Sequence, residues 1–332
     1  MAITIYREQD ADLSMISGQC VAIIGYGNQG RAHALNLRDS GVGVVVGQRR
    51  GPGFDRATED GFDPVSLSDA ARNADLIVLT LPDELAAEIY AVHIAPVISA
   101  SKTLGFVHGF NVRYGFIHPP PDVDVIMIAP KGPGTLVRSL YREGKGVPAL
   151  LAIHQNPSGG AKKLALSWAM AIGATRAGVV ETTFATETET DLFGEQVSLC
   201  GGLTALTKAA FETLVDAGYE PEFAYLECVH ELKQIADLLY ARGLSAMRTA
   251  ISNTAEYGDL TRGPRLITDQ TRLEMKRILD DVQSGAFAKE WIAETRAGGE
   301  RFKKLHDADV YSDYEKAGET VRKLMPWLTG GD

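Results

Sequence analysis

The sequence predicts two domains, an α/β Rossmann domain with a doubly wound, mostly parallel sheet and then an all-helical domain. One observation is an apolar run of strand length at 20–25, which a glycine-rich turn joins to a helical pattern. A second is the alternation of short apolar runs with stretches of crossover-helix length as far as residue 180. Beyond that point the strand signals stop and helical patterns continue.

Length, charge and cysteine content restrict the class of protein. A chain of 332 residues is long for one core, and 45 % hydrophobic with 23 % charged residues is ordinary for a soluble protein. The net charge of −10 argues against nucleic acid or an anionic membrane surface as a partner. The sequence lacks a signal-peptide pattern and an apolar segment of membrane-spanning length, and its three cysteines show no CxxC spacing. We therefore expect a cytoplasmic protein with reduced thiols.

The order of these patterns places the domain boundaries. Strands are expected at 20–25, 42–47, 75–82, 102–109, 124–130 and 147–154, with a weaker candidate for the last strand at 174–180. Helices are expected at 188–216, 221–242, 243–257, 266–283 and 285–298, and a docking helix with a frayed end is expected at 300–332. We therefore predict a dinucleotide-binding domain at 1–181, a helical metal- and substrate-binding domain at 182–327 and a tail at 328–332.

The glycine-rich turn predicts a dinucleotide site. Gly25-Tyr26-Gly27-Asn28-Gln29-Gly30 follows the first expected strand of the sheet and opens a helix. Glycines in this context allow a tight turn and a close approach of a pyrophosphate to the helix N-terminus. A glycine-rich turn without a ligand is the alternative. The residues expected to contact a nicotinamide dinucleotide are Gly25, Tyr26, Gly27, Asn28 and Gln29.

Residues at the carboxyl ends of other expected strands extend this site, because ligands of doubly wound sheets bind there. His108 and Lys131 are titratable groups placed to reach a nicotinamide and its substrate. From position alone, a histidine hydrogen-bonded at a strand end is an equal alternative for His108, and an exposed loop lysine is the alternative for Lys131. The further residues expected to contact the cofactor are Arg49, Arg50, Pro82, Asp83 and Gly134.

Two acidic pairs in the helical domain predict a metal site. Asp191 and Glu195 are four residues apart, as are Glu227 and Glu231, and this spacing places each pair on one helix face. The flanking residues are apolar around most of each helix, so we expect both helices to be buried. Four carboxylates from two helices suit Mg²⁺ or Mn²⁺ better than Zn²⁺. On these residues alone, a solvated acidic stripe remains the alternative.

Six motifs together resemble the ketol-acid reductoisomerase (acetohydroxyacid isomeroreductase) family. They occur in the family's order and span nearly the whole chain. The length resembles the short class, whose second domain is a knotted helical domain completed by a second subunit. The resemblance therefore implies a homodimer or a higher homo-oligomer. The motifs are Gly25–Gly30, His108–Asn111, Ala129–Gly134, Asp191–Gln196, Glu227–Leu232 and Ser252–Gly258.

The resemblance also implies a reaction and the metal ligands. The enzyme would take 2-acetolactate or 2-aceto-2-hydroxybutyrate, in valine and isoleucine biosynthesis, through an alkyl shift and a reduction to a 2,3-dihydroxy-3-alkyl acid. Two Mg²⁺ ions would stabilise the ketone and hydroxyl oxygens during the shift. Asp191 is expected to bridge both ions, Glu195 to complete one, and Glu227 and Glu231 to hold the other.

The family further implies catalytic and substrate-binding roles. His108 is expected to act as the base with Lys131 close by, although water or a carboxylate could accept the proton and leave His108 a positioning role. Glu231 is expected to contact the substrate as well as the metal. Ser252 is expected to donate to the substrate carboxylate or to accept from a substrate hydroxyl.

Three other classes of protein are alternatives to this hypothesis. A simple hydroxyacid dehydrogenase would need no metal and would leave four carboxylates without a purpose. A non-catalytic nicotinamide-sensing protein would not need His108, Lys131 and the acids together. A di-iron carboxylate protein requires two Glu-x-x-His units, and this chain has one, Glu227–His230, with Glu195–Ser198 at the matching position.

The residues after the second expected strand bear on the nicotinamide cofactor. Arg49 and Arg50 follow it without a nearby acid, and the general rule for such loops then favours NADPH. In the family, however, the first arginine lies over the adenine and serines further along hold the 2′-phosphate. This loop is shorter and has Pro52 and Gly53 where those serines would fall. We therefore favour NADH, or use of both cofactors, with Arg50 as the residue that could restore phosphate binding.

Overall fold

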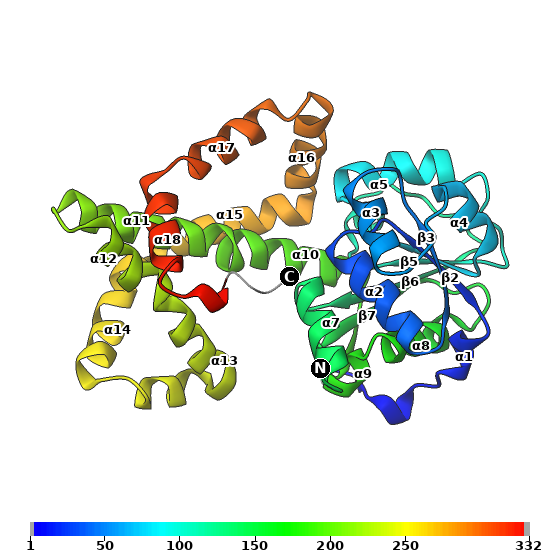
Figure 1. Cartoon of the computed structure of the whole chain (residues 1–332), viewed down its shortest axis with the longest axis horizontal. Coiled ribbons are helices and arrows are strands. Elements are labelled where there is room, and N and C mark those ends of the chain that lie inside the picture. Colours follow the sequence, from blue (N-terminus) through cyan, green and yellow to red (C-terminus); the bar gives the residue numbers. More distant parts are fainter. Residues whose placement is uncertain (1–2, 329–332) are drawn as a thin grey trace. The chain divides into compact units, whose positions relative to one another are not determined.

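The computed structural model describes residues 3–328, and the chain divides into two compact units (Figure 1). Met1–Thr190 form the unit that we call the Rossmann unit, and Asp191–Asp332 form the helical unit. The predicted fold class, a Rossmann domain followed by a helical domain, is confirmed. Most of the predicted tail at 328–332 lies outside the described residues.

An eight-stranded sheet forms the centre of the Rossmann unit, in the order β1-β8-β7-β6-β5-β4-β2-β3. The sheet is mostly parallel, as predicted, but β7 runs antiparallel to β6, and β1 antiparallel to β8. The strands are β1 (Ile5–Tyr6), β2 (Cys20–Ile24), β3 (Gly43–Gly47), β4 (Leu76–Leu79), β5 (Thr103–Phe106), β6 (Asp124–Pro130), β7 (Ala149–Gln155) and β8 (Val179–Thr182).

Helices cover both faces of this sheet, and the alternation along β2 demonstrates it. Val21 and Ile23 belong to one buried apolar cluster, whereas Ala22 and Ile24 belong to another. The helical elements are η1 (Glu8–Asp10), α1 (Ser14–Ser17), α2 (Asn28–Asp39), α3 (Pro52–Glu59), α4 (Leu67–Asn73), α5 (Asp83–Ile89), η2 (Tyr90–Ile94), α6 (Phe110–Arg113), α7 (Gly134–Arg142), α8 (Ala161–Ala171), α9 (Ala174–Ala177) and α10 (Phe184–Gly194).

The last strand differs from the sequence prediction. A strand was expected at 174–180, but the short helix α9 occupies the first part of this range. Gly178 then has a φ of 130°, and β8 begins at Val179. The β-branched residues Val179 and Val180 pair with β7, so the strand signal was real but lay further along the chain than expected.

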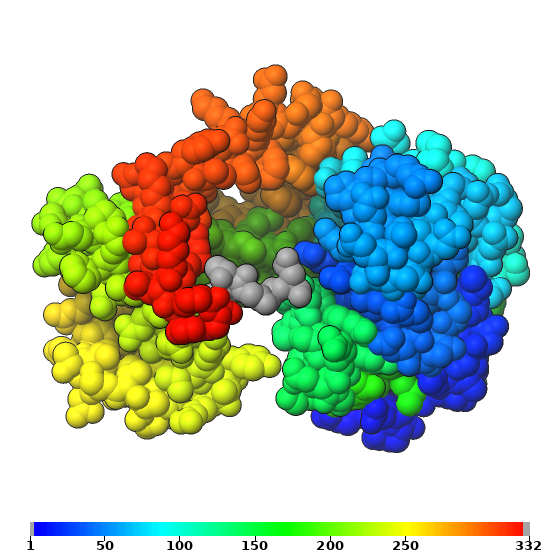
Figure 2. Space-filling model, viewed as in Figure 1, coloured from blue at the N-terminus to red at the C-terminus, as the bar shows by residue number. Residues whose placement is uncertain are grey.

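The helical unit contains helices and no strand among the described residues. Figure 2 shows α13 and α14, in yellow-green and yellow, as a lobe at one end of this unit. The helices expected at 188–216 and 221–242 are each divided by a π-helical turn, and the expected docking helix is two helices, α17 and α18. The elements are η3 (Glu195–Leu199), α11 (Gly201–Asp216), α12 (Pro221–Tyr225), η4 (Leu226–His230), α13 (Leu232–Thr249), α14 (Asn253–Leu266), α15 (Asp269–Ser284), α16 (Ala286–Arg296), α17 (Glu300–Val310), α18 (Asp313–Arg322) and η5 (Pro326–Leu328).

The expected burial of the acid-bearing helices is wrong for the single chain. Glu195, Glu227 and Glu231 are exposed, and Asp191 is half-buried. Several large apolar side chains of these helices are exposed as well, among them Leu206 at 51 % and Tyr240 at 92 %. A helix with apolar residues on all sides is buried only if other elements pack around it. The helical unit of one chain does not provide enough such elements. Over the residues that the structure describes, no helix is long and apolar enough to cross a membrane.

Candidate functional site

The glycine-rich turn between β2 and α2 has the geometry that a pyrophosphate requires. Gly25 has a φ of 99°, and a Cβ on it would lie 2.7 Å from the Thr80 carbonyl oxygen, so only glycine fits. Gly27 is the N-cap of α2 and supplies no side-chain hydrogen bond. Within the described chain, no atom lies within 4 Å of the position that its Cβ would take. The first N–H groups of α2 therefore face open space that a phosphate could fill.

A cleft of about 320 Å³ runs along this turn at the carboxyl ends of the strands. Five of the residues predicted to bind the cofactor line it, namely Gly25, Tyr26, Gly27, Arg49 and Pro82. Gly53, which replaces one of the serines that the family uses for phosphate, also lines it. The sequence analysis did not predict the remaining residues of the lining to contact the cofactor. These are Gln48, Arg56, Leu67, Thr80, Leu81, Leu85 and Ile89.

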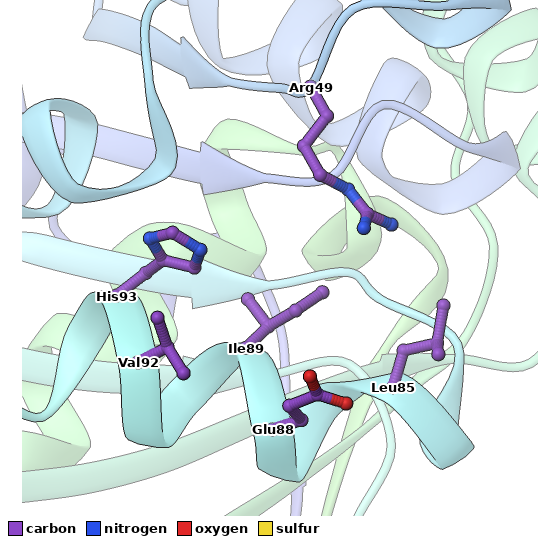
Figure 3. A pocket seen from close by; sticks show the side chains of 6 residues that line it. All are labelled: Arg49, Leu85, Glu88, Ile89, Val92 and His93. Atoms are coloured by element: carbon purple, nitrogen blue, oxygen red, sulfur yellow. The ribbon is translucent and has the colours of Figure 1, made fainter. Parts of the chain in front are cut away.

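A smaller cavity of about 120 Å³ continues the cleft, since Arg49, Leu85 and Ile89 line both. In Figure 3 the Arg49 guanidinium lies opposite the apolar side chains of Ile89 and Leu85. Glu88, Val92 and His93 complete the lining. A cationic plane opposite aliphatic side chains suits a flat aromatic ring such as adenine, because the guanidinium can stack on its face.

The other residues predicted to bind the cofactor do not line the cleft. Gln29 donates from Nε2 to the Gly132 carbonyl at 2.9 Å, which ties the glycine-rich turn to the loop that contains Lys131. A Cβ on Gly134 would lie 2.4 Å from the Asn28 carbonyl carbon, so these loops pack together backbone to backbone. The other two of this group are Arg50, whose guanidinium lies 4.0 Å from the centre of the Phe54 ring, and Asp83, whose carbonyl accepts from Asn111.

His108 and Lys131 meet at a third residue, Glu187, which the sequence analysis missed. The Glu187 carboxylate lies 3.1 Å from Nδ1 of His108 and accepts from Nζ of Lys131 at 2.9 Å. It also accepts from the Gly109 N–H at 3.0 Å. The side chain of Glu187 is only 1 % exposed. Within the Rossmann unit, α10 therefore supplies a buried anion that joins His108 and Lys131, two of the three predicted catalytic residues, of which the third is Glu231.

The charge of Glu187 decides the chemistry of this cluster. Burial raises the pKa of its carboxyl, but the hydrogen bonds and charges of His108 and Lys131 outweigh burial and lower it to about 2. The carboxylate is therefore ionised at neutral pH. A carboxylate beside Nδ1 favours the tautomer in which Nδ1 carries the proton, and Nε2 is then the basic nitrogen. Lys131 contributes a positive charge beside it.

A repeat in the sequence could have revealed Glu187. It lies four residues before Asp191, which in turn lies four residues before Glu195, so three acids recur at one-turn intervals. The pair Asp191 and Glu195 that was singled out from the sequence began one turn too late. The tight approach of α10 to Gly109 is the tertiary contact that the sequence does not reveal, since a Cβ there would lie 3.0 Å from the Phe184 carbonyl oxygen.

In the helical unit, the predicted metal ligands surround two π-helical turns. Asp191 lies near the end of α10 and Glu195 begins η3, whereas Glu227 lies in η4 and Glu231 directly follows it. π turns are rare and occur frequently at functional sites. Ser252 is the N-cap of α14, and its exposed hydroxyl accepts from the Ala255 N–H at 3.1 Å.

Comparison with known proteins assigns both units. Residues 15–178 match the family model described as acetohydroxy acid isomeroreductase, NADPH-binding domain. Residues 184–327 match the model described as ketol-acid reductoisomerase, C-terminal domain. The chain belongs to the ketol-acid reductoisomerase family. It is therefore a ketol-acid reductoisomerase by enzyme class and uses a nicotinamide cofactor.

Solved structures agree with this assignment. An NADH-preferring ketol-acid reductoisomerase from an uncultured archaean is 44 % identical, with a TM-score of 0.95 over 98 % of this chain and 99 % of that one. A semialdehyde dehydrogenase NAD-binding protein from Cupriavidus necator is 20 % identical, with a TM-score of 0.61 over 80 % of this chain and 99 % of that one. At that identity, the second similarity concerns the fold alone.

The residues of this ketol-acid reductoisomerase fit both groups that its family implies. The open space over Gly27 and the N-terminus of α2 fit the pyrophosphate of a dinucleotide. The four predicted ligands in the helical unit are all carboxylates, and carboxylate oxygens are the donors that Mg²⁺ prefers. The exposure of Glu195, Glu227 and Glu231 in the single chain leaves these three accessible to a hydrated ion.

Proposed function

We propose that this ketol-acid reductoisomerase converts 2-acetolactate and 2-aceto-2-hydroxybutyrate to 2,3-dihydroxy-3-alkyl acids, with Mg²⁺, in valine and isoleucine biosynthesis. The alkyl group moves from the carbon that bears the tertiary hydroxyl to the neighbouring ketone carbon. The hydroxyl loses its proton as its carbon becomes a ketone, which is then reduced. The observation that carries this proposal is the cluster of His108, Lys131 and Glu187 in the unit that contains the dinucleotide cleft.

The cluster supplies the proton chemistry of both steps. Nε2 of His108 is the basic nitrogen when Nδ1 faces Glu187, so it can accept the proton of the tertiary hydroxyl. Lys131 pairs with Glu187 and is placed to stabilise negative charge that develops on a substrate oxygen. During reduction, the same groups can return a proton to the new hydroxyl oxygen. Glu187 positions both residues and remains ionised throughout.

The carboxylates of the helical unit are proposed to hold two Mg²⁺ ions. Asp191 would bridge the ions, Glu195 would complete one, and Glu227 and Glu231 would hold the other. When bound, the ions polarise the ketone and hydroxyl oxygens of the substrate, and the nicotinamide supplies the hydride. Glu231 and Ser252 are proposed to orient the substrate, with the Ser252 hydroxyl still able to donate its proton while it accepts from Ala255.

The test follows the loss of reduced-nicotinamide absorbance with 2-acetolactate, with and without Mg²⁺. We expect turnover only when 2-acetolactate and Mg²⁺ are both present. In the reverse assay with the oxidised cofactor, we expect no turnover of a simple 2-hydroxy acid such as lactate. A second assay supplies the rearranged 2-keto acid and so isolates the reduction. Turnover with 2-acetolactate that chelation of divalent ions leaves unchanged would contradict the proposal.

For the cofactor we propose NADH, or use of both nicotinamides. Pro52 is the first residue of α3 and has neither a hydroxyl nor an N–H to offer a 2′-phosphate. Arg50 lies over the Phe54 ring, a contact that holds its guanidinium on α3. The relative from the uncultured archaean prefers NADH. Dissociation constants and specificity constants for both cofactors test this, and an NADPH advantage above about a hundredfold, roughly 2.7 kcal/mol, would contradict it.

We also propose that the enzyme is at least a homodimer, joined through the helical unit. Exposed apolar side chains concentrate on that unit, including Leu206, Tyr240, Leu244 and Leu260. A concentration of exposed apolar side chains favours association with a partner. Light scattering at micromolar concentration tests the proposal, and a monomer would contradict it.

A further inference from the structure

The π-helical turn η3 connects α10, which carries the proposed metal ligand Asp191, to α11 (Figure 1). The turn begins at Glu195 itself. The Cys200 N–H donates to the Glu195 carbonyl at 2.9 Å, five residues back instead of four. A π turn accommodates one more residue than an α turn, and in a helix with 3.6 residues per turn one residue corresponds to a rotation of about 100°. The turn therefore sets the rotation of α11 relative to the helix face that carries Asp191 and Glu195.

Two glycines, Gly201 and Gly202, follow this turn after one intervening residue, Cys200. A Cβ on Gly202 would lie 2.7 Å from the Val197 carbonyl carbon, and closer still to its oxygen. A Cβ on Gly201 would lie 3.1 Å from the Gln196 carbonyl carbon, and again closer to the oxygen. Both carbonyls belong to η3, and backbone atoms cannot move aside as the end of a flexible side chain can. Any larger residue at these positions is therefore incompatible with the π turn as it stands.

The face of α11 that the turn orients is packed. Phe211 is 3 % exposed and belongs to a buried cluster with Ala224 and Tyr225 of α12 and with Ala317 and Val321 of α18. A change from a π turn to an α turn, at constant sequence length, would rotate either this face or Glu195 by about 100°. Because rotating Phe211 would expose an aromatic side chain, we expect Glu195 to be the residue that loses its orientation.

We propose that Gly201 and Gly202 are positioning residues for the metal site: they permit the π turn that holds Glu195 in its binding orientation while α11 stays packed. The inference rests on the proposed Mg²⁺ site. It does not extend to the second π turn, η4, in which the Glu231 N–H donates to the Leu226 carbonyl at 3.1 Å. Leu232 and Lys233 occupy the positions after η4 that correspond to Gly201 and Gly202 after η3, so that turn forms without glycines.

Binding of Mn²⁺ to the full-length protein, followed by electron paramagnetic resonance without substrate, tests the proposal. We expect Gly202→Ala to weaken Mn²⁺ binding at least tenfold while the far-ultraviolet circular dichroism spectrum and the binding of reduced nicotinamide stay unchanged. The matched control is Gly194→Ala, directly before Glu195, because its Cβ would meet only a Leu199 methyl group at 3.8 Å. This control should bind Mn²⁺ within about threefold of the wild type.

A compensating variant separates the turn from other effects of the new methyl group. Deleting the exposed Ser198 in the Gly202→Ala background removes the additional residue, so the segment can continue as an α-helix with both faces in their original rotation. We expect this variant to recover Mn²⁺ binding to within about threefold of the wild type. If Gly202→Ala fails to fold, recovery of folding and of Mn²⁺ binding by the deletion is the expected result.

The outcomes distinguish this inference from the proposed function. Wild-type protein that binds no Mn²⁺ would overturn the metal site and the inference with it. Wild-type binding that Gly202→Ala leaves unchanged would overturn the inference alone. Failure of the Ser198 deletion to restore binding would also overturn it, because the glycines would then act by some means other than the π turn.

Discussion

The two units of this enzyme differ in how much of their apolar and charged side chains they bury. The Rossmann unit encloses its sheet between two apolar clusters and buries His33, Asp124 and Glu187. Of the described residues, the helical unit buries no acidic or basic side chain, and one of its core clusters has five buried members. The charged cluster of the Rossmann unit is complete in one chain, whereas three of the four predicted metal ligands of the helical unit lie exposed and the fourth, Asp191, is half-buried.

This difference shows that the candidate residues of the two units depend on different forces. In the Rossmann unit, strands separated in sequence bring residues together and exclude water, so one buried carboxylate can orient two other groups. In the helical unit, one chain provides the predicted ligands but little of their surroundings. Many apolar side chains of this unit face outward, and they form the surface through which we propose that a second subunit binds.

The largest expected effect compares the two interiors directly. Ile23→Ala, at a fully buried position on β2, should cost about 2–5 kcal/mol of unfolding free energy, because it removes packed methyl groups and leaves a cavity. Leu260→Ala, at a side chain 51 % exposed on α14, should cost less than about 0.5 kcal/mol in the monomer. Urea unfolding of the isolated subunit at low protein concentration measures both. Equal losses would contradict the comparison.

The next effect concerns the charge that the Rossmann unit buries. Glu187→Gln keeps the shape but removes the charge that orients His108 and Lys131, so turnover should fall about a hundredfold, roughly 2.7 kcal/mol. The matched control is Glu189→Gln on the same helix, which breaks a more exposed ion pair with Arg113 and should retain activity within about threefold. Nicotinamide binding should be unchanged in both, and similar losses in both would argue against a special role for Glu187.

A smaller effect tests what covers the helical unit. Leu206→Glu places a charge on an apolar side chain that is 51 % exposed in the single chain. If a second subunit covers it, the dissociation constant of the dimer should rise about thirtyfold, near 2 kcal/mol. Analytical ultracentrifugation over a dilution series gives this constant, and Leu136→Glu on the Rossmann unit, 42 % exposed, is the control. An unchanged constant would place the interface elsewhere.

The smallest effect is a pH dependence that belongs to the Rossmann unit. Burial lowers the pKa of His33 from 6.5 to about 3, so the folded state keeps it neutral while the unfolded chain takes up a proton below pH 6.5. Its contribution is complete above that pH and is lost as the pH falls towards 3. Between pH 7.5 and 5.5 the wild type should lose about 1.4 kcal/mol through this group. Urea unfolding of the wild type and of His33→Phe at both values measures it, and an equal loss in the variant would contradict the assignment.

Local patterns were sufficient for most elements of the fold. The run at 20–25 and its GxGxxG turn gave β2, the N-terminus of α2 and part of the cleft, because strand, turn and helix signals are all set by neighbouring residues. The strand expected at 124–130 has the predicted bounds. Antiparallel β7, by contrast, was expected in a parallel sheet, because the direction of a strand depends on how its connection packs, which hydrophobic periodicity does not encode.

For the site, the sequence predicted the types of the candidate residues better than it predicted their surroundings. His108 and Lys131 followed from their places after strands, but Glu187 required the contact between α10 and the loop at Gly109. The two π turns were also missed, since a helical pattern with one added residue still looks helical in a short window. Burial of the acid-bearing helices was predicted from their apolar residues and proved wrong for one chain.

The sequence by itself determined the domain order, the dinucleotide turn and the candidate residues for the catalytic chemistry. Each depends on chemical type and on spacing along the chain, and both can be read directly. Only the tertiary structure decided that Glu187 joins His108 to Lys131, and that Glu195, Glu227 and Glu231 are exposed in a single chain. Those outcomes depend on which surfaces pack together from positions far apart in the sequence. The free energy of burial arises from these contacts and cannot be assigned to a single residue.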